Sequence, residues 1–307
     1  MKIVFLGNHT VGVKALETIS KMADVVGVVS HPPDPEDGIR YLSVYDFAIQ
    51  QGWTVIRSIG KNPSLENFIQ NAQPDLLWVT DYRYLLPLSL LQLAPLGAVN
   101  LHPSLLPKYR GRAPLNWAIL QGERELGLTA HFIDNGTDTG DIIEQIRFEL
   151  SPTQDVGDAL EIIYPIYQNL TRIVLKYFQT GKIPRKPQNH SQATIFPARK
   201  PQDGLINWQQ TASSIHNLIR AVAKPYPGAF TYFGNWNITI WKACVESSFH
   251  KATPGQILSV SLDKQFCVAC GEGILRVLDF TIEPQIEQGF RISLGDMLHQ
   301  NIGESIE

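Results

Sequence analysis

The first hundred residues alternate short apolar runs with amphipathic ones, and this alternation constrains the fold more than any other feature of the chain. Strand-like runs cover residues 2–7, 24–30, 54–57, 75–80 and 97–102. Helix-like stretches cover residues 11–22, 41–52, 64–72 and 85–95. The strand-like runs are apolar almost throughout, as is typical of strands that helices bury on both faces. We therefore predict an α/β fold, a Rossmann-like domain with a mostly parallel sheet.

The next part of the chain continues this domain. Residues 126–133 and 142–150 read as two strands, and residues 158–181 read as a long amphipathic helix. Pro165 lies inside that helix and predicts a kink, whereas Gly181 predicts its end. No function follows from this alternation alone, because proteins of many different functions are built on such a sheet.

The last hundred residues have a different character. After a helix-like stretch at 212–223, short β-prone runs follow one another at the spacing typical of a small β-barrel of the OB-like kind. Residues 183–203 are rich in proline and polar side chains, and we interpret them as a linker. The predicted organisation is a catalytic domain over 1–182, a linker over 183–203 and a β-barrel domain over 204–307.

Composition excludes several classes of protein. The net charge of -3 provides no global basic field for nucleic acid, and no apolar run approaches the ~20 residues of a membrane span. The start of the chain reads as a first strand rather than a signal peptide, so we expect a cytoplasmic protein. The eight histidines are scattered, and Cys267 and Cys270 form a lone C-x-x-C in a strand-like run, so we expect no metal.

A candidate site follows the strand over residues 97–102. Asn100 and His102 are two residues apart and should share one face of that strand, at the edge of the sheet where α/β proteins bind ligands. An amide can donate to a developing oxyanion, and an imidazole can move a proton near neutral pH. A structural role for His102 stays open at this point.

A second loop, D-N-G-T-D-T-G-D over residues 134–141, offers carboxylates that could orient the imidazole. The carboxylates are those of Asp134, Asp138 and Asp141. The residues alone do not tell which of the three meets His102, and a simple turn between two strands is the alternative interpretation.

The motif N-L-H-P-S-L-L-P at residues 100–107, followed about 36 residues after His102 by D-T-G-D, resembles the 10-formyltetrahydrofolate-dependent formyltransferase family, and within it the sugar N-formyltransferases. The later segments D-G-L-I-N-W, I-H-N-L-I-R-A-V-A-K-P-Y-P-G-A-F and I-T-I-W-K-A are similar to the C-terminal β-barrel domain of the longer members. The resemblance covers essentially the whole chain.

This resemblance implies a role for each residue of the motifs. Asn100 would stabilise the oxyanion, His102 would transfer the proton, and Asp138 would orient His102 and raise its pKa. The co-substrate would be 10-formyltetrahydrofolate, without a metal. The implied folate contacts are Tyr84, Leu85, Leu86, Arg112, Asp134, Asn135, Gly136 and Thr137.

Members of this family differ in the amine that accepts the formyl group, and the two main candidates here are methionyl-tRNA and a nucleotide-linked amino sugar. Methionyl-tRNA formyltransferases carry a long basic insertion after the second strand, whereas the equivalent stretch here is short and contains Asp34, Glu36 and Asp37 against Arg40. Such acidic residues would repel a phosphate backbone, so we expect a nucleotide-linked amino sugar rather than nucleic acid. The counter-argument is a basic set in and beside the linker, namely Lys182, Arg185, Lys186, Arg199 and Lys200.

The expected function is therefore transfer of a formyl group to an amino-sugar nucleotide, which the resemblance connects with lipopolysaccharide or O-antigen biosynthesis. Side chains available for the nucleotide or sugar are Tyr41, Tyr45, Tyr109, Arg110 and Trp117. Three alternatives stay open: a methionyl-tRNA formyltransferase, a formyltetrahydrofolate hydrolase, and a sensing module that lacks catalysis. The nucleotide, the sugar and the position of the amine are undecided, and a homodimer is an open alternative because members of the family are often dimeric.

Overall fold

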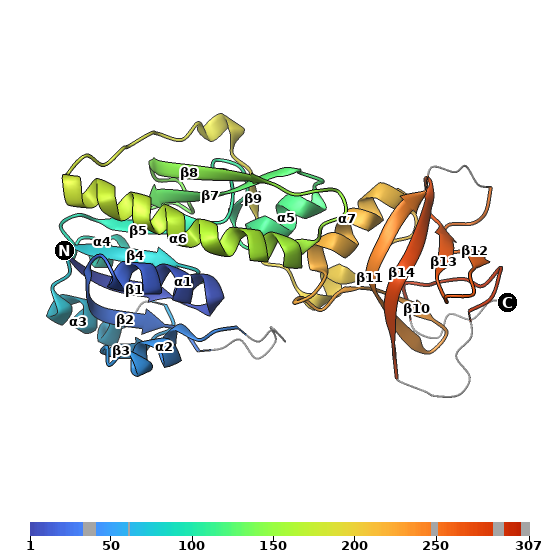
Figure 1. The fold of residues 1–307 in the computed structure, drawn as a ribbon, viewed down its shortest axis with the longest axis horizontal. Helices are drawn as coiled ribbons and strands as arrows, with labels where there is room; N and C mark the ends of the chain where they lie inside the picture. The colour runs from blue at the N-terminus through green and yellow to red at the C-terminus, as the bar shows by residue number, and fades with distance from the viewer. Residues whose placement is uncertain (33–40, 61, 247–250, 285–291, 302–307) are drawn as a thin grey trace. The chain divides into compact units, whose positions relative to one another are not determined.

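A computed structural model describes residues 1–32, 41–60, 62–246, 251–284 and 292–301. The chain forms two compact units (Figure 1). Unit 1 comprises Met1–Pro114, Glu125–Glu149 and Leu160–Pro197, and unit 2 comprises Leu115–Arg124, Leu150–Ala159 and Ala198–Glu307. The acidic stretch with Asp34, Glu36, Asp37 and Arg40 lies outside the described residues.

Unit 1 is built on a seven-stranded sheet of order β3-β2-β1-β4-β5-β7-β8. Its strands are β1 (Lys2–Gly7), β2 (Asp24–Ser30), β3 (Val55–Arg57), β4 (Leu76–Thr80), β5 (Ala98–His102), β7 (Glu125–Phe132) and β8 (Ile142–Glu149). The first five strands in this order pair in parallel, and β7 and β8 pair antiparallel. The mostly parallel sheet predicted from the apolar runs is confirmed.

Helices cover both faces of this sheet because the alternating side chains of the strands are apolar on both sides. Ile3 and Phe5 belong to a buried cluster with residues of α1 (His9–Ser20), α2 (Val44–Gln50) and α6 (Val156–Thr180). Val4 and Leu6 belong to a second cluster with α3 (Pro63–Ala72) and α4 (Leu88–Leu91). Each fully buried side chain of this size stabilises the fold by about 1.5–3 kcal/mol.

The ends of the helices follow from local sequence. Ser43 caps α2 by accepting a hydrogen bond from the Asp46 amide, and Asn62 caps α3 by accepting one from the Leu65 amide. Gly181 directly follows α6 with a φ of 68°, a left-handed conformation that suits glycine and ends the helix as predicted. Pro165 lies within the continuous helix α6.

Unit 2 contains a five-stranded antiparallel sheet of order β10-β11-β14-β13-β12. The strands are β10 (Ala229–Phe233), β11 (Trp236–Glu246), β12 (Ile257–Val260), β13 (Phe266–Ala269) and β14 (Ile274–Glu283), and the helices are α5 (Pro114–Leu120), η2 (Pro201–Gly204) and α7 (Ala212–Val222). Cys267 lies on β13, and Cys270 follows it as a buried thiol whose pKa burial raises to about 12. The predicted C-terminal β domain is confirmed.

Two further short elements belong to unit 1. The two-residue strands β6 (Arg110–Gly111) and β9 (Ile195–Phe196) pair in parallel, and η1 (His190–Gln192) precedes β9. This ladder joins the segment after His102 to a segment 85 residues further along the chain. Within the described ranges, no helix combines the length and apolar character required for crossing a membrane.

Candidate active site

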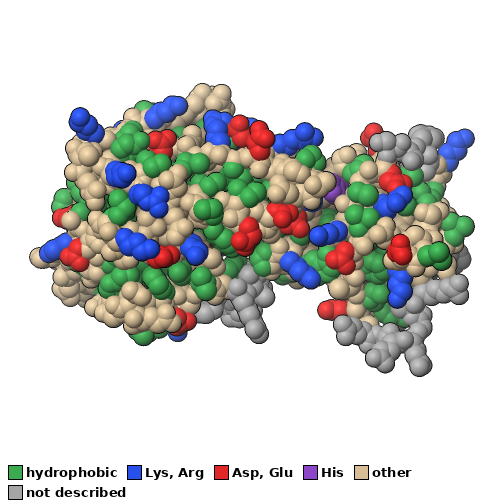
Figure 2. Space-filling model, in the orientation of Figure 1, with side chains coloured by type: hydrophobic (Ala, Val, Ile, Leu, Met, Phe, Trp, Pro, Cys, Tyr) green, Lys and Arg blue, Asp and Glu red, His purple; other side chains and the backbone are tan. Residues whose placement is uncertain are grey.

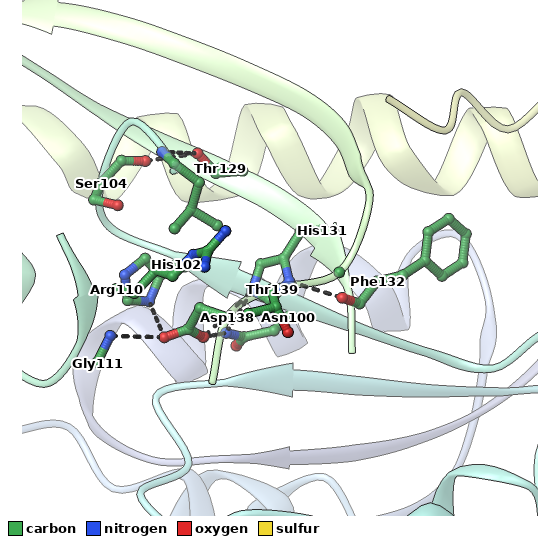
Figure 3. Close-up of polar contacts among 12 residues, drawn as sticks. Asn100, His102, Ser104, Arg110, Gly111, Thr129, His131, Phe132, Asp138 and Thr139 are labelled. Carbon is green, nitrogen blue, oxygen red and sulfur yellow. Dashed lines mark hydrogen bonds and ion pairs between the residues drawn. The ribbon is translucent and has the colours of Figure 1, made fainter. Parts of the chain in front are cut away.

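Four polar side chains meet where β5 and β7 lie side by side (Figure 3). Asn100 and His102 project from β5, as their spacing predicts. His131 stands opposite Asn100 in the β5–β7 register, and Asp138 comes from the loop between β7 and β8. The structure therefore brings the three residues proposed from the sequence together and adds a fourth, His131.

His102 is held at one ring nitrogen and faces a charge at the other. Its Nε2 donates to the Tyr109 carbonyl at 2.8 Å, while Nδ1 lies 3.7 Å from Oδ2 of Asp138. The tautomer protonated at Nε2 leaves Nδ1 as the nitrogen that can accept a proton. Burial lowers the pKa of His102, and although Asp138 and the Tyr109 carbonyl raise it, the effect of burial prevails. The imidazole is consequently neutral at pH 7.

Asp138 is an ionised carboxylate surrounded by donors. Burial by itself would raise the pKa of Asp138, but His102, His131 and the Gly111 amide lower it far more, to well below its usual range. The Gly111 N–H donates to Oδ2 at 2.9 Å, and the Asn100 amide donates to Oδ1 at 3.4 Å. The backbone of Asp138 has a φ of 53°, a left-handed conformation that is strained for a residue with a side chain.

His131 completes this network, and the sequence analysis did not find it. Its Nδ1 donates to the Phe132 carbonyl at 2.8 Å, which leaves Nε2 to accept from the Asn100 amide at 3.2 Å. The same Nε2 lies 3.5 Å from Oδ1 of Asp138. His131 thus orients the Asn100 amide. The signal in the sequence was weak, because His131 becomes a neighbour of Asn100 only through the strand register.

The loop over residues 134–141 resolves which carboxylate faces the imidazole. Asp138 does so, while Asp141 pairs with Arg185 at 3.6 Å. Asp134 shapes the turn itself, since its Oδ1 accepts from the Thr139 hydroxyl at 2.5 Å and from the Gly136 amide at 3.0 Å. The alternative of a simple turn therefore applies to Asp134 but not to Asp138.

The other residues implied as folate contacts come from three segments: Tyr84, Leu85 and Leu86 follow β4, Arg112 follows β6, and the remainder lie in the loop that carries Asp138. Leu85 is 76% exposed, whereas Leu86 is buried in the cluster with Val4 and Leu6. Tyr84 packs partly against the same cluster, and Arg112 is exposed directly after Gly111. Asn135 and Gly136 are exposed, and Thr137 is half-buried. Leu85 and Arg112 thus present accessible side chains, whereas Leu86 belongs to the core.

A second histidine–carboxylate pair lies at the ends of β1 and β4. His9 Nδ1 and Asp81 Oδ2 are 2.6 Å apart, and the Tyr41 ring lies 3.8 Å from the His9 ring, centroid to centroid. Burial alone would raise the pKa of Asp81. The His9 hydrogen bond and the charges of His9, His31 and Arg112 outweigh this effect, so the pKa lies below its ordinary value. His9 and Asp81 both adopt positive φ, 59° and 56°. This pair extends the polar surface of the edge.

The candidate side chains for a nucleotide have internal partners. Arg110 is 5% exposed and donates to Gln188, so its guanidinium is part of the interior. The Tyr109 ring stacks on Phe196 at 5.4 Å, and Arg57 lies over the Tyr45 ring. In unit 2, Arg199 lies over the Trp117 ring at 4.8 Å. The ring of Tyr41 packs against that of His9.

A neutral buried imidazole, an ionised carboxylate and an oriented amide at the carboxyl edge of a Rossmann-like sheet form an arrangement that can combine proton transfer with oxyanion stabilisation. Among the described residues, no group of three or more His, Cys, Asp or Glu could hold a metal ion. The family model described as formyl transferase matches residues 1–162, and that of the formyl transferase C-terminal domain matches residues 199–290. The chain belongs to the formyl transferase family.

Several solved structures share the fold. An N-formyltransferase from Helicobacter canadensis, in complex with folinic acid and dTDP-3-aminofucose, matches with a TM-score of 0.70 and 22% identity, over 92% of this chain and 100% of that one. WlaRD, a sugar 3N-formyltransferase, matches with a TM-score of 0.68 and 20% identity, over 93% and 99%. A methionyl-tRNA formyltransferase from Clostridium thermocellum matches with a TM-score of 0.52 and 19% identity, over 81% and 95%.

Proposed function

We propose that this formyltransferase moves the formyl group of 10-formyltetrahydrofolate to the amino group of a nucleotide-linked amino sugar. The observation that carries the proposal is the ionised Asp138 facing Nδ1 of a neutral His102. The carboxylate raises the basicity of the imidazole at Nδ1, which is the nitrogen that can accept a proton.

The reaction follows from these three side chains. The amine attacks the formyl carbon, a C–N bond forms and the carbonyl oxygen becomes an oxyanion. Asn100 stabilises this oxyanion; its 3.4 Å contact with Asp138 is long, so the N–H can turn to the new charge. His102 takes the proton of the attacking amine at Nδ1 and gives it to N10 of the folate as the old C–N bond breaks. One oxyanion donor contributes about 3 kcal/mol.

We propose that the folate lies between the loop of Asp138 and the segment after β4. The accessible side chains of Leu85 and Arg112 support this, since an apolar surface suits the pterin and a cation suits the carboxylates of the folate tail. Tyr84, Leu86 and residues Asp134, Asn135, Gly136 and Thr137 would form the rest of the folate site.

A nucleotide-linked amino sugar is favoured as the acceptor. Both sugar N-formyltransferases described above match over nearly their whole length, with higher TM-scores than the methionyl-tRNA enzyme. Two of the five basic residues that could favour tRNA have other partners: Arg185 pairs with Asp141 and lies over the Phe132 ring, and Arg199 lies over Trp117. On the face in Figure 2, Lys and Arg are interspersed with Asp and Glu. A tRNA needs a basic surface.

Formylated amino-sugar nucleotides are activated donors of sugar residues. We accordingly place the reaction in the cytoplasm, upstream of lipopolysaccharide or O-antigen assembly. The substrate partner is a small molecule.

One mass-spectrometric panel tests the function. The protein is incubated with 10-formyltetrahydrofolate and, in separate reactions, UDP- or dTDP-linked 3- and 4-amino sugars, charged initiator tRNA, or no acceptor. We expect a mass gain of one formyl group on an amino-sugar nucleotide. Formylation of the tRNA alone would establish the methionyl-tRNA function instead, and folate turnover without an acceptor would establish a hydrolase.

A further inference from the structure

The segment over residues 186–196, here called the strap, folds back onto the catalytic loops of unit 1. Lys186 exchanges two backbone hydrogen bonds with Ile142, at 2.8 and 2.9 Å. At its other end, β9 pairs with β6, and the Thr194 hydroxyl accepts from the Tyr109 amide at 2.8 Å. The strap therefore contacts both the segment that holds His102 and the segment that carries Asp138.

Gln188 lies near the start of the strap, is 6% exposed, and uses all its hydrogen-bonding groups. Its Nε2 donates to the carbonyl of Asp138 and to that of Gly140, each at 2.8 Å. Its Oε1 accepts from Nε and Nη2 of the buried Arg110, at 3.2 and 2.6 Å. The charge of Arg110 polarises this carboxamide and strengthens its N–H donors.

These bonds act on the residue whose backbone is strained. A left-handed φ on a residue with a side chain costs about 1–3 kcal/mol and persists only where the surroundings hold it. Asp138 adopts such a φ, and Gln188 fixes the carbonyl groups of Asp138 and Gly140. On the other side, the Gly111 amide fixes the carboxylate itself.

We propose that Gln188 is a positioning residue, which holds the Asp138 carboxylate against Nδ1 of His102 by clamping the backbone of its loop. The proposal deepens the formyl-transfer mechanism and rests on it for its effect on turnover. The basicity of His102 then depends on a buried strap residue that acts through the Asp138 loop.

Two variants separate this role from simple packing. Gln188→Glu keeps an acceptor for Arg110 but replaces the N–H donors by an oxygen facing two carbonyls. Gln188→Met removes the donors without adding charge. We expect both to lower kcat by about 10- to 100-fold with little change in KM, since a misplacement of about 1 Å at a catalytic group costs up to 100-fold. Gln192, exposed in the same strap, provides the matched controls Gln192→Glu and Gln192→Met.

A pH titration of His102 by NMR needs no substrate and so tests the clamp apart from the function. Because Asp138 raises the pKa of His102, we expect that pKa to fall in Gln188→Met and to stay unchanged in Gln192→Met. Far-UV circular dichroism confirms folding, and Gln188→Asn, which withdraws the donors by one methylene, replaces a variant that does not fold. An unchanged pKa of His102 in folded Gln188→Met, or wild-type kcat in Gln188→Glu, would overturn the proposal. If the wild type transfers no formyl group, the function fails, and the titration still decides the clamp.

Discussion

Oδ2 of Asp138 lies 3.7 Å from Nδ1 of His102, too far for a hydrogen bond but close enough for a strong interaction between charges. The orientation of the ring is set elsewhere, by the hydrogen bond from Nε2 to the Tyr109 carbonyl. The carboxylate and the carbonyl therefore have separate tasks: the carbonyl fixes the ring, and the carboxylate raises its basicity against the stronger effect of burial.

We predict that His102→Gln lowers kcat by about 10²–10⁴-fold, the usual contribution of general acid–base catalysis. Glutamine can still donate to the Tyr109 carbonyl, whereas His102→Ala removes this buried hydrogen bond and should lower the free energy of unfolding by about 1–3 kcal/mol. Steady-state kinetics and urea unfolding measure the two effects. His216→Gln, the same change on α7, is the control, and near-wild-type turnover in His102→Gln would remove this residue from the mechanism.

We predict that Asp138→Asn shifts the acidic limb of kcat/KM to lower pH. Wild-type activity falls as the pH drops through the pKa of His102, because protonated His102 accepts no proton. Asp138 raises that pKa, so its loss lowers the pKa and moves the limb downward. The maximal kcat/KM, reached above that limb, should also fall by about 10²-fold or more, because the imidazole is a weaker base. Rate measurements across pH test this prediction, and a limb that moved upward would contradict it.

The sheet could be predicted from the sequence because parallel strands that are buried on both faces are apolar almost throughout. Residues 3–6 and 76–79 are apolar on both faces of the sheet, and this pattern can be seen without knowing which elements pack against them. The ladder between β6 and β9 has no such signal, since two residues show no periodicity. The proline and polar residues over 183–203, which include the strap, consequently predict a linker.

The site divides in the same way. Asn100 and His102 could be paired from their spacing on one strand, and the family motif selected Asp138 from three carboxylates. His131 depends on the register of β5 against β7, and the His9–Asp81 pair depends on β1 lying beside β4. Both depend on how distant strands pair, and the residue pattern within one segment does not indicate that pairing.

We predict that His131→Ala lowers kcat by about 10- to 100-fold with a small effect on the KM of the folate. The change removes the acceptor that orients the Asn100 amide, so the oxyanion donor is no longer held in one place. His131→Gln, which can offer an oxygen to the same amide, should recover part of the loss. Equal kcat in His131→Ala and the wild type would show that Asn100 needs no such support.

We predict that Gly140→Ala lowers both stability and kcat, because a Cβ at this position would clash with the Phe132 carbonyl oxygen. The backbone must move, and Asp138 lies two residues away in the same clamped loop. Overpacking of this kind costs about 1–3 kcal/mol. Gly181→Ala is the control, since it strains a positive φ of 68° but meets no atom within 4 Å. It should lose about 1 kcal/mol of unfolding free energy and keep its kcat. Equal kcat losses in the two variants would mean that strain alone, rather than displacement of Asp138, reduces turnover.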